Sequence, residues 1–512
     1  MISVLATCRT VYQQHSSGNW LMWLPSIFII FFVLLVSGCS SLIHPPVTHK
    51  EVKSSELGKT FTPAQLKADL DFMFETLEAV HPNLYAYTNV SVIKKERENV
   101  KLRLNRPMTR IEFYKELAPL VALLKDGHTS VYSPYEEWEQ YKKQGGLLFP
   151  FAVEITASHT YIQANYSTDT SITTGTELLS INGKSIQEIG TELTSYISGE
   201  RQAFKNQLLS NGFGYRLWST YRWEGPFEVS IKTKRELPYF TKVPGITIED
   251  LKIKLNQTKK QKPEYYTYRY LPEFRAGLID FLSFSDYNRF KEFLEKTFTQ
   301  MKAEGAENLI IDIRKNGGGN STLGDLLLTY LTDKPFNQIS QMDIKVSKQI
   351  KHYYRHFLPW YIRWLPLQWI HPFGRKLWST PEGGIATWEE KPVKPKTNKL
   401  LFTGKTYVLI GSNTFSSASM FASAVKDYQI GTLIGEETGG LATSYGDVYS
   451  FDLPDTRISV GVSHKRFVRP NGQDDGHGVL PDYEASENPE DMDKGIDTVL
   501  EFTKQLIKSE RQ

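Results

Sequence analysis

Short buried strands alternate with helical segments between residues 276 and 505, and this alternation limits the fold more than any other feature. The runs AGLIDFLSF, NLIIDI, TYVLIG and GTLIGE are apolar and bounded by turn residues, as buried strands are. Between the first two, apolar residues recur at helical spacing from Phe290 to Met301. Further helices are expected at STLGDLLLTYL and after Thr414. Strands alternating with helices predict an α/β domain, which we place at residues 265–505.

A helical domain is predicted ahead of this core, at residues 61–145. In FTPAQLKADLDFMFETLEAV, Thr62 can cap a helix and Pro63 suits its first turn. The apolar spacing predicts a second helix from Arg110 to Leu124, which runs into KDGHTSV.

A small β domain is predicted next, at residues 146–240. AVEI, YIQA and ELLSI read as short strands, and Asn182-Gly183 is a typical hairpin turn. The run GTELLSINGKSIQEI resembles the second half of a PDZ domain, which would imply capture of a peptide by strand addition. An unrelated small β domain is the alternative.

The N-terminus holds the one long apolar run, WLMWLPSIFIIFFVLLV at 20–36. It is short, broken by Pro25, and followed by Val36-Ser37-Gly38-Cys39, which resembles a bacterial lipobox. That resemblance implies a cleaved leader at 1–39 and lipid on the Cys39 thiol; the alternative is an uncleaved membrane anchor. Either way we expect a membrane-anchored protein of the bacterial cell envelope that faces the periplasm or the exterior.

The segment 40–60 is polar and contains Pro45-Pro46, and we interpret it as a tether from the membrane. Met22 is an alternative start, although the only basic residue of the preceding segment, Arg9, would then be lost.

Composition excludes several classes of protein. Lys and Arg number 60 and Asp and Glu 57, so the net charge is 60 − 57 = +3, which gives no argument for nucleic acid binding. The mean hydropathy of -0.37 excludes a polytopic membrane protein. The only cysteines are Cys8 and Cys39, so the body can hold neither a disulfide nor a cysteine metal site.

An aromatic insertion interrupts the core at 339–398. It contains HYYRHFLPWYIRWLPLQWIHPFGRKLW, with four tryptophans among basic residues. Three interpretations stay open: a lid over a substrate groove, a surface that dips into the membrane interface, or a satellite hydrophobic cluster packed on the core.

Four segments place chemically useful residues at the ends of regular elements. His128 follows Asp126-Gly127 after a predicted helix. A buried strand ends in Asn316-Gly317-Gly318-Gly319, where backbone amides can approach a ligand, but no Walker lysine follows. Ser416 lies between a strand and a helix, like the serine of a nucleophile elbow. The loop RPNGQDDGHGVLPD brings acidic residues and a histidine together.

These segments together resemble the tail-specific (C-terminal processing) serine protease family, in its tricorn-core-like branch. HPNLY, LLKDGHTSV, IDIRKNGGGN, TFSSASMFASAVKD, IGEETGG and GHGVLPD follow the family's order over residues 62–500. The resemblance implies a ββα-superhelical core of the Clp-protease/crotonase type and a serine peptidase without metal or cofactor. Peptides or proteins are the implied substrates.

The resemblance also implies roles for individual residues. Ser416 takes the nucleophile position and His128 that of the general base. The amide of Ser417, with that of Gly317 or Gly318, is the implied oxyanion hole.

An acid near the final motif is implied as the partner of the base, with Asp475 as the first match and Asp474 as the second.

Two departures from the family pattern are present. Leu441 stands where the lysine-dyad branch carries its base, so a Ser-Lys mechanism is not expected. Gly127 stands where the tricorn-like branch has a relay serine, so a direct contact between acid and histidine is the hypothesis. The alternative function is a catalytically inactive, membrane-anchored peptide-binding or scaffold protein on the same fold.

Overall fold

The computed structural model describes residues 56–233, 237–258, 264–358, 360–488, 491 and 494–511. The predicted leader and most of the predicted tether lie outside these residues. Ser41–Gln512 form one unit. Of the helices in the described ranges, none combines the length and the apolar character needed to cross a bilayer.

The N-terminal part is helical, as the sequence predicts. Its first helix begins at Pro63, and a capping box joins Thr62 to Gln65. The third helix starts at Arg110 and ends at Ala122, two residues before the predicted end. The helices are α3 (Pro63–Val80), α4 (Val90–Arg103), α5 (Arg110–Ala122) and α6 (Tyr135–Lys143), with a short β1–β2 pair (Thr60–Phe61 and Met108–Thr109) beside them.

The small β domain is an antiparallel sheet of order β4-β5-β6-β8-β9, against which α8 packs. The predicted hairpin turn is confirmed, since Asn182 and Gly183 both have positive φ angles between β6 and β7. The PDZ likeness stays a prediction. The elements are β4 (Phe151–Ile155), β5 (Thr160–Asn165), β6 (Glu177–Ile181), β7 (Lys184–Ser185), α7 (Ile186–Thr194), α8 (Gln202–Tyr221), β8 (Phe227–Lys232), β9 (Tyr239–Val243) and then α9 (Ile248–Thr258).

The α/β core predicted from the alternating pattern is confirmed. Its sheet has the order β10-β11-β12-β15-β16-β19, and every pair after the β10–β11 edge is parallel. The strands are β10 (Tyr266–Leu271), β11 (Ala276–Phe281), β12 (Asn308–Asp312), β15 (Lys405–Ile410), β16 (Thr432–Gly435) and β19 (Tyr483–Glu484), and a 3-10 turn, η3 (Pro272–Phe274), follows β10.

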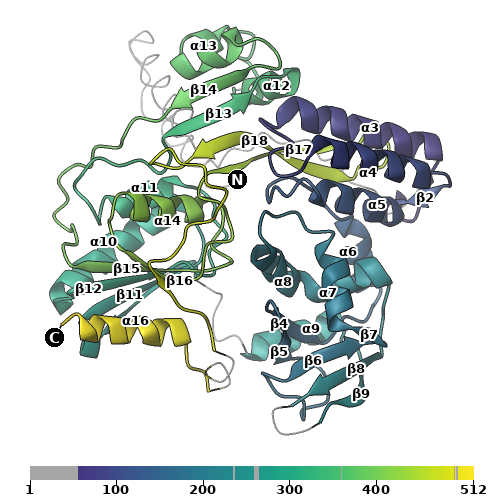
Figure 1. The fold of residues 1–512 in the computed structure, drawn as a ribbon, viewed down its shortest axis with the longest axis horizontal. Helices are drawn as coiled ribbons and strands as arrows, with labels where there is room; N and C mark the ends of the chain where they lie inside the picture. The colour runs from purple at the N-terminus through teal and green to yellow at the C-terminus, as the bar shows by residue number, and fades with distance from the viewer. Residues whose placement is uncertain are drawn as a thin grey trace, which may run out of the picture. The chain divides into compact units, whose positions relative to one another are not determined.

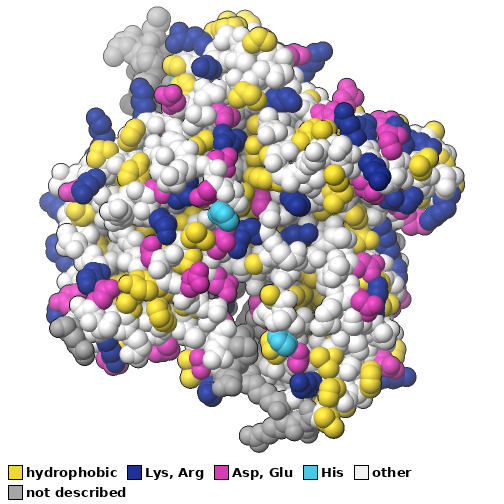
Figure 2. Space-filling view, in the orientation of Figure 1, with side chains coloured by type: hydrophobic (Ala, Val, Ile, Leu, Met, Phe, Trp, Pro, Cys, Tyr) yellow, Lys and Arg dark blue, Asp and Glu magenta, His cyan; other side chains and the backbone are white. Residues whose placement is uncertain are grey.

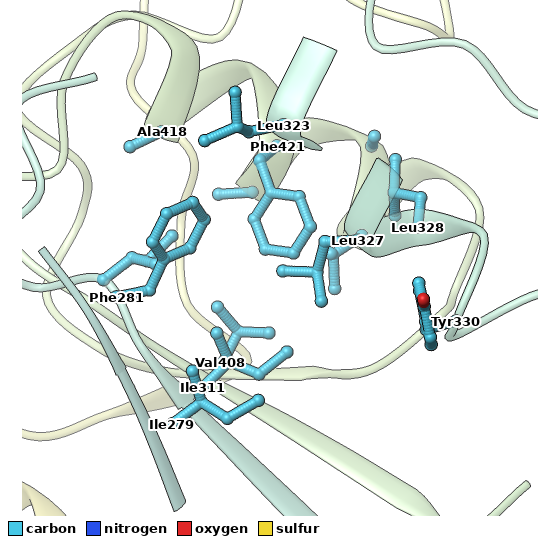
Figure 3. Packing of buried hydrophobic residues seen from close by; sticks show 14 of the residues in the cluster. Ile279, Phe281, Ile311, Leu323, Leu327, Leu328, Tyr330, Val408, Ala418 and Phe421 are labelled. Atoms are coloured by element: carbon cyan, nitrogen blue, oxygen red, sulfur yellow. The ribbon is translucent and has the colours of Figure 1, made fainter. Parts of the chain in front are cut away.

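Helices cover both faces of this sheet, and α16 lies on the opposite side from α11 and α14 (Figure 1). Successive residues of a strand point to opposite faces of the sheet. Ile311 therefore packs with α10, α11 and α14, which form the larger helix layer, and Ile310 packs with α16. Figure 3 shows the larger layer, where Phe421 and Leu327 face the sheet residue Val408. The helices are α10 (Tyr287–Glu304), α11 (Thr322–Leu328), α14 (Ser417–Asp427) and α16 (Thr498–Ser509).

A second sheet, of order β14-β13-β18-β17, includes the two flanks of the predicted insertion. The strand β13 pairs with β14 and also with β18, so the flanks are built into a sheet. The two-residue strand β3, next to His128, pairs with the same β18. The elements are β3 (Ser130–Val131), β13 (Gln341–Lys345), α12 (Lys348–His356), η4 (Leu367–Trp369), α13 (Pro372–Ser379), β14 (Ile385–Glu389), β17 (Ser444–Asp452) and β18 (Ser459–Val468).

The topology brings two of the predicted functional segments together. Because β12 and β15 are parallel neighbours, their carboxyl ends meet at one edge of the core sheet. The glycine-rich turn follows β12 and the turn to Ser416 follows β15.

Candidate active site

Ser416 occupies a strained turn between β15 and α14. Its φ of 55° and ψ of −125° lie in a region that non-glycine residues rarely adopt. Hydrogen bonds hold the turn. The Thr414 hydroxyl donates to the carbonyl of Ile313, and the amide of Phe415 donates to the carbonyl of Asn316. The Ser416 side chain makes no capping bond to α14, which leaves its hydroxyl available.

His128 lies against this hydroxyl, although 288 positions separate the two residues in the sequence. Its Nε2 is 3.1 Å from Ser416 Oγ. The imidazole stacks on the ring of Phe415 at 4.6 Å between centroids, and Phe415 stacks in turn on Phe204 of α8 at 4.1 Å. The base and nucleophile predicted from the sequence are therefore in contact, and two aromatic rings fix the plane of the base.

Burial lowers the pKa of His128 below its usual value of 6.5. The negative charges of Asp126 and Asp447 and the backbone of Tyr445 oppose this effect without cancelling it. The neutral ring can accept the Ser416 proton at Nε2 when Nδ1 carries the hydrogen. Nδ1 is shut off from solvent and, among the described residues, forms no hydrogen bond of acceptable geometry.

Asp126 positions the loop that carries His128. The carboxylate is buried and accepts hydrogen bonds from the hydroxyls of Thr129 (2.5 Å) and Ser463 (2.6 Å) and from the backbone amide of His128 (3.1 Å). Burial acts to raise its pKa, but the hydrogen bond from His81 and the charges of both histidines hold the pKa below its usual range. Asp126 is therefore a carboxylate at neutral pH.

The HPNLY motif supplies one of these contacts. His81 Nε2 lies 3.0 Å from the Asp126 carboxylate, while its Nδ1 accepts a hydrogen bond from the amide of Asn83. This pairing puts the His81 proton on Nε2. The sequence analysis assigned no role to His81 or Asp126. Their positions in HPNLY and LLKDGHTSV, two motifs of the same family pattern, could have indicated that both residues belong to the site.

The predicted acids Asp474 and Asp475 lie elsewhere. Asp474 accepts a hydrogen bond of 2.8 Å from Arg466, and Asp475 lies 3.8 Å from Arg469. Neither is hydrogen-bonded to His128. Their role as the acid partner of the base therefore stays a prediction.

Gly127 is required by packing. A Cβ at this position would lie 2.7 Å from the ring of Phe415 and 3.0 Å from Oε2 of Glu200, so the relay serine expected from the resemblance has no room. The Gly127 amide instead donates to Oε1 of Glu200 at 3.2 Å. Burial, and secondarily the charge of Asp126, raises the pKa of Glu200 to about 8.

The glycine-rich turn presses against Ser416. Gly318 has a φ of 97°, and a Cβ there would lie 2.8 Å from that of Ser416. Its amide donates to the Asn316 side chain at 2.9 Å and is already used. The amides of Gly317 and Ser417 carry no hydrogen bond within the described ranges, so these two remain available to an oxyanion.

The ETGG loop completes the surroundings of Ser416. Arg201 forms an ion pair of 2.6 Å with Glu437 and donates to the carbonyls of Glu437 and Thr438. Leu441, at the position of the family lysine, is buried. In the part of the chain that the structure describes, no lysine is hydrogen-bonded to Ser416, and no cluster of His, Cys, Asp and Glu could hold a metal ion.

A comparison with known families decides the identity of the core. Residues 275–485 match the model of peptidase family S41. Residues 275–485 therefore form a peptidase family S41 domain. The protein is accordingly a serine peptidase, a hydrolase that acts on peptides or proteins, and the family predicted from the sequence motifs is confirmed.

Two solved structures agree in fold with this protein. Mature CPAF complexed with lactacystin is 15% identical with a TM-score of 0.64, covering 87% of this chain and 99% of that one. Mature CPAF alone is 16% identical with a TM-score of 0.61, covering 87% and 98%. At these identities the likeness extends to the fold alone. The photosystem II D1 C-terminal processing protease is 16% identical over 86% of this chain and 97% of its own, with a TM-score of 0.44.

We expect Glu200 to make the stability of this S41 peptidase depend on pH. The folded state holds the Glu200 proton more tightly than the unfolded state does. Proton binding by Glu200 therefore stabilises the fold fully at pH values below the pKa of this carboxyl in the unfolded chain, and the stabilisation is lost as pH rises toward 8. Glu200→Gln has no such proton. Relative to wild type, its free energy of unfolding should increase by roughly 1–3 kcal/mol between about pH 5 and pH 8.

Urea denaturation at both pH values measures this difference. Glu188→Gln, at an exposed position of α7, is the matched control, because hydrogen bonds from Ser185 lower rather than raise the pKa of that carboxyl. A pH-independent difference for Glu200→Gln would contradict the prediction.

Proposed function

We propose that this S41 peptidase cleaves peptide bonds through a Ser416 acyl-enzyme, with His128 as general base. The observation that carries the proposal is the 3.1 Å contact between His128 Nε2 and Ser416 Oγ. The lowered pKa of His128 supports it, because a neutral imidazole is the form that accepts a proton.

In the proposed mechanism, Nε2 of His128 takes the hydroxyl proton while Ser416 Oγ attacks the peptide carbonyl. The amides of Gly317 and Ser417 hold the oxyanion, a contribution of roughly 3 kcal/mol per donor. The N-terminus of α14 stabilises the same charge. His128 then protonates the leaving amine, and water releases the acyl group.

Asp126 acts on this chemistry through the position of His128. Its bonds to the His128 backbone and to Ser463 of β18 hold the loop in place. Asp126 is therefore a positioning residue, whereas Asp475 and Asp474 remain the predicted acids of the family pattern.

A catalytically inactive peptide-binding protein is the second candidate. The observation that favours it is the Nδ1 of His128, which is hydrogen-bonded to no carboxylate among the described residues, unlike the base of a Ser-His-Asp triad. A reaction of Ser416 with a mechanism-based probe separates the two candidates.

We expect a fluorophosphonate probe to label the wild-type protein and not Ser416→Ala. Ser412→Ala removes a nearby serine outside the proposed machinery and should label like wild type. His128→Ala should label at least about 100-fold more slowly, because a general base contributes that much or more.

His477→Ala is the control for the base, because the His477 side chain is 63% exposed and lies 3.9 Å from Glu437. Equal labelling of wild type and Ser416→Ala contradicts the nucleophile. Loss of labelling in His477→Ala alone contradicts the base.

The rate of labelling should fall on acidification with a midpoint below pH 6.5. Protonation of His128 removes the base, and the lowered pKa keeps the ring neutral until the solution is more acidic. Asp447→Asn should move the midpoint to still lower pH, because it removes a charge that favours the protonated ring. The second-order rate constant measured across the acid range gives both midpoints. A midpoint above 6.5, or one that rises in Asp447→Asn, contradicts the assignment.

The peptidase acts outside the cytoplasm in this proposal, held to the bacterial envelope through Cys39. The apolar run at 20–36 and the Val36-Ser37-Gly38-Cys39 sequence support it. The mature N-terminus should begin at Cys39 with a mass increase from attached lipid, and Cys39→Ser should abolish both. Mass spectrometry of membrane-extracted protein tests this, and an intact residue 1 on the mature chain contradicts it.

A further inference from the structure

The segment from Val346 to Pro381 has a charge unlike that of the rest of the protein. It contains no Asp or Glu, whereas the whole chain has a net charge of +3. The six basic residues give it a charge of +6, so the remainder of the chain sums to 3 − 6 = −3. They are Lys348, Lys351, Arg355, Arg363, Arg375 and Lys376.

The same segment exposes large apolar side chains. Trp360 is 79% exposed, Trp364 78%, Ile370 61%, Tyr361 59% and Trp369 47%. These five residues, which we call the aromatic patch, lie within eleven positions of the chain. Figure 2 shows hydrophobic and basic side chains side by side at the top of the molecule, over α12 and α13.

The exposed rings are held by the chain around them. Arg363 donates to the carbonyls of Leu358 (2.7 Å) and His356 (3.1 Å), and the Trp364 indole donates to the carbonyl of Tyr361 (2.8 Å). Trp360 also contacts the ring of Tyr361 at 5.8 Å between centroids. Fixed rings lose little conformational entropy when a partner covers them.

The inward side of the segment is already packed. Tyr353 of α12 is buried against Tyr449 and His464 of the second sheet, and Leu377 of α13 is fully buried. The satellite-cluster interpretation accounts for these residues. It does not account for Trp360 and Trp364, which point away from the core with most of their surface in solvent.

We propose that the aromatic patch inserts into the interface of an anionic lipid bilayer. Trp and Tyr side chains favour the headgroup level of a membrane, and Lys and Arg around them are attracted to anionic lipids. A segment without any carboxylate is suited to a negative surface. The proposed lipid on Cys39 and a tether of about twenty residues, with a reach of roughly 70 Å, would keep the patch near a membrane. The proposal does not depend on the proposed catalysis.

Amide hydrogen exchange of the full-length protein on lipid vesicles tests this proposal. It reports on the patch itself, so the result does not depend on whether the N-terminus attaches the protein to the vesicle. We compare phosphatidylcholine vesicles with vesicles that also contain phosphatidylglycerol. The amides of residues 355–378 should exchange roughly tenfold more slowly on the anionic vesicles, and high salt should remove the difference.

The double variant Trp360→Ser/Trp364→Ser should lose this protection while it labels with fluorophosphonate like wild type. Leu102→Ser is the matched control, because Leu102 of α4 is exposed by 74% and lies outside the patch. Equal exchange on both kinds of vesicle overturns the proposal. Protection on phosphatidylcholine that increases with protein density also overturns it, because a second copy of the chain would then be the partner.

Discussion

The buried carboxylate of Asp126 is the interaction on which the site depends. It belongs to the loop after α5, yet it accepts a hydrogen bond from Ser463 on β18, 337 positions later. Burying a charge is costly unless several donors satisfy it, and here two hydroxyls, an imidazole and a backbone amide do so. These bonds, together with the pairing of β3 with β18, hold the loop against the second sheet and so fix the position of His128 relative to Ser416.

Much of the fold follows from local pattern. The buried strands β12 and β15 and the helix α14 are visible as apolar runs with turn residues at their ends, and the capping box at Thr62 fixes the start of α3. The position of Ser416 between a strand and a helix is local information of the same kind. The contact with His128 could be predicted only through the family resemblance, because no local pattern relates residues so far apart.

Other features depend on tertiary contacts that a single sequence does not reveal. The flanks of the aromatic insertion pair with β18, although each looks like an independent short strand. Asp474, the second of the two predicted acids, accepts a hydrogen bond from Arg466, a contact that motif position does not reveal. The missing serine at position 127 looked like a lost catalytic part, whereas it reflects the space taken by Phe415 and Glu200.

The stack of Phe204, Phe415 and His128 joins three separate parts of the molecule. Phe415 precedes Ser416 directly, so one ring contacts the base and belongs to the strained turn of the nucleophile. Phe204 extends the stack into α8, the helix on which the small β domain packs. A displacement of α8 would therefore reach the base and the nucleophile together, because the ring between them belongs to the turn that carries Ser416.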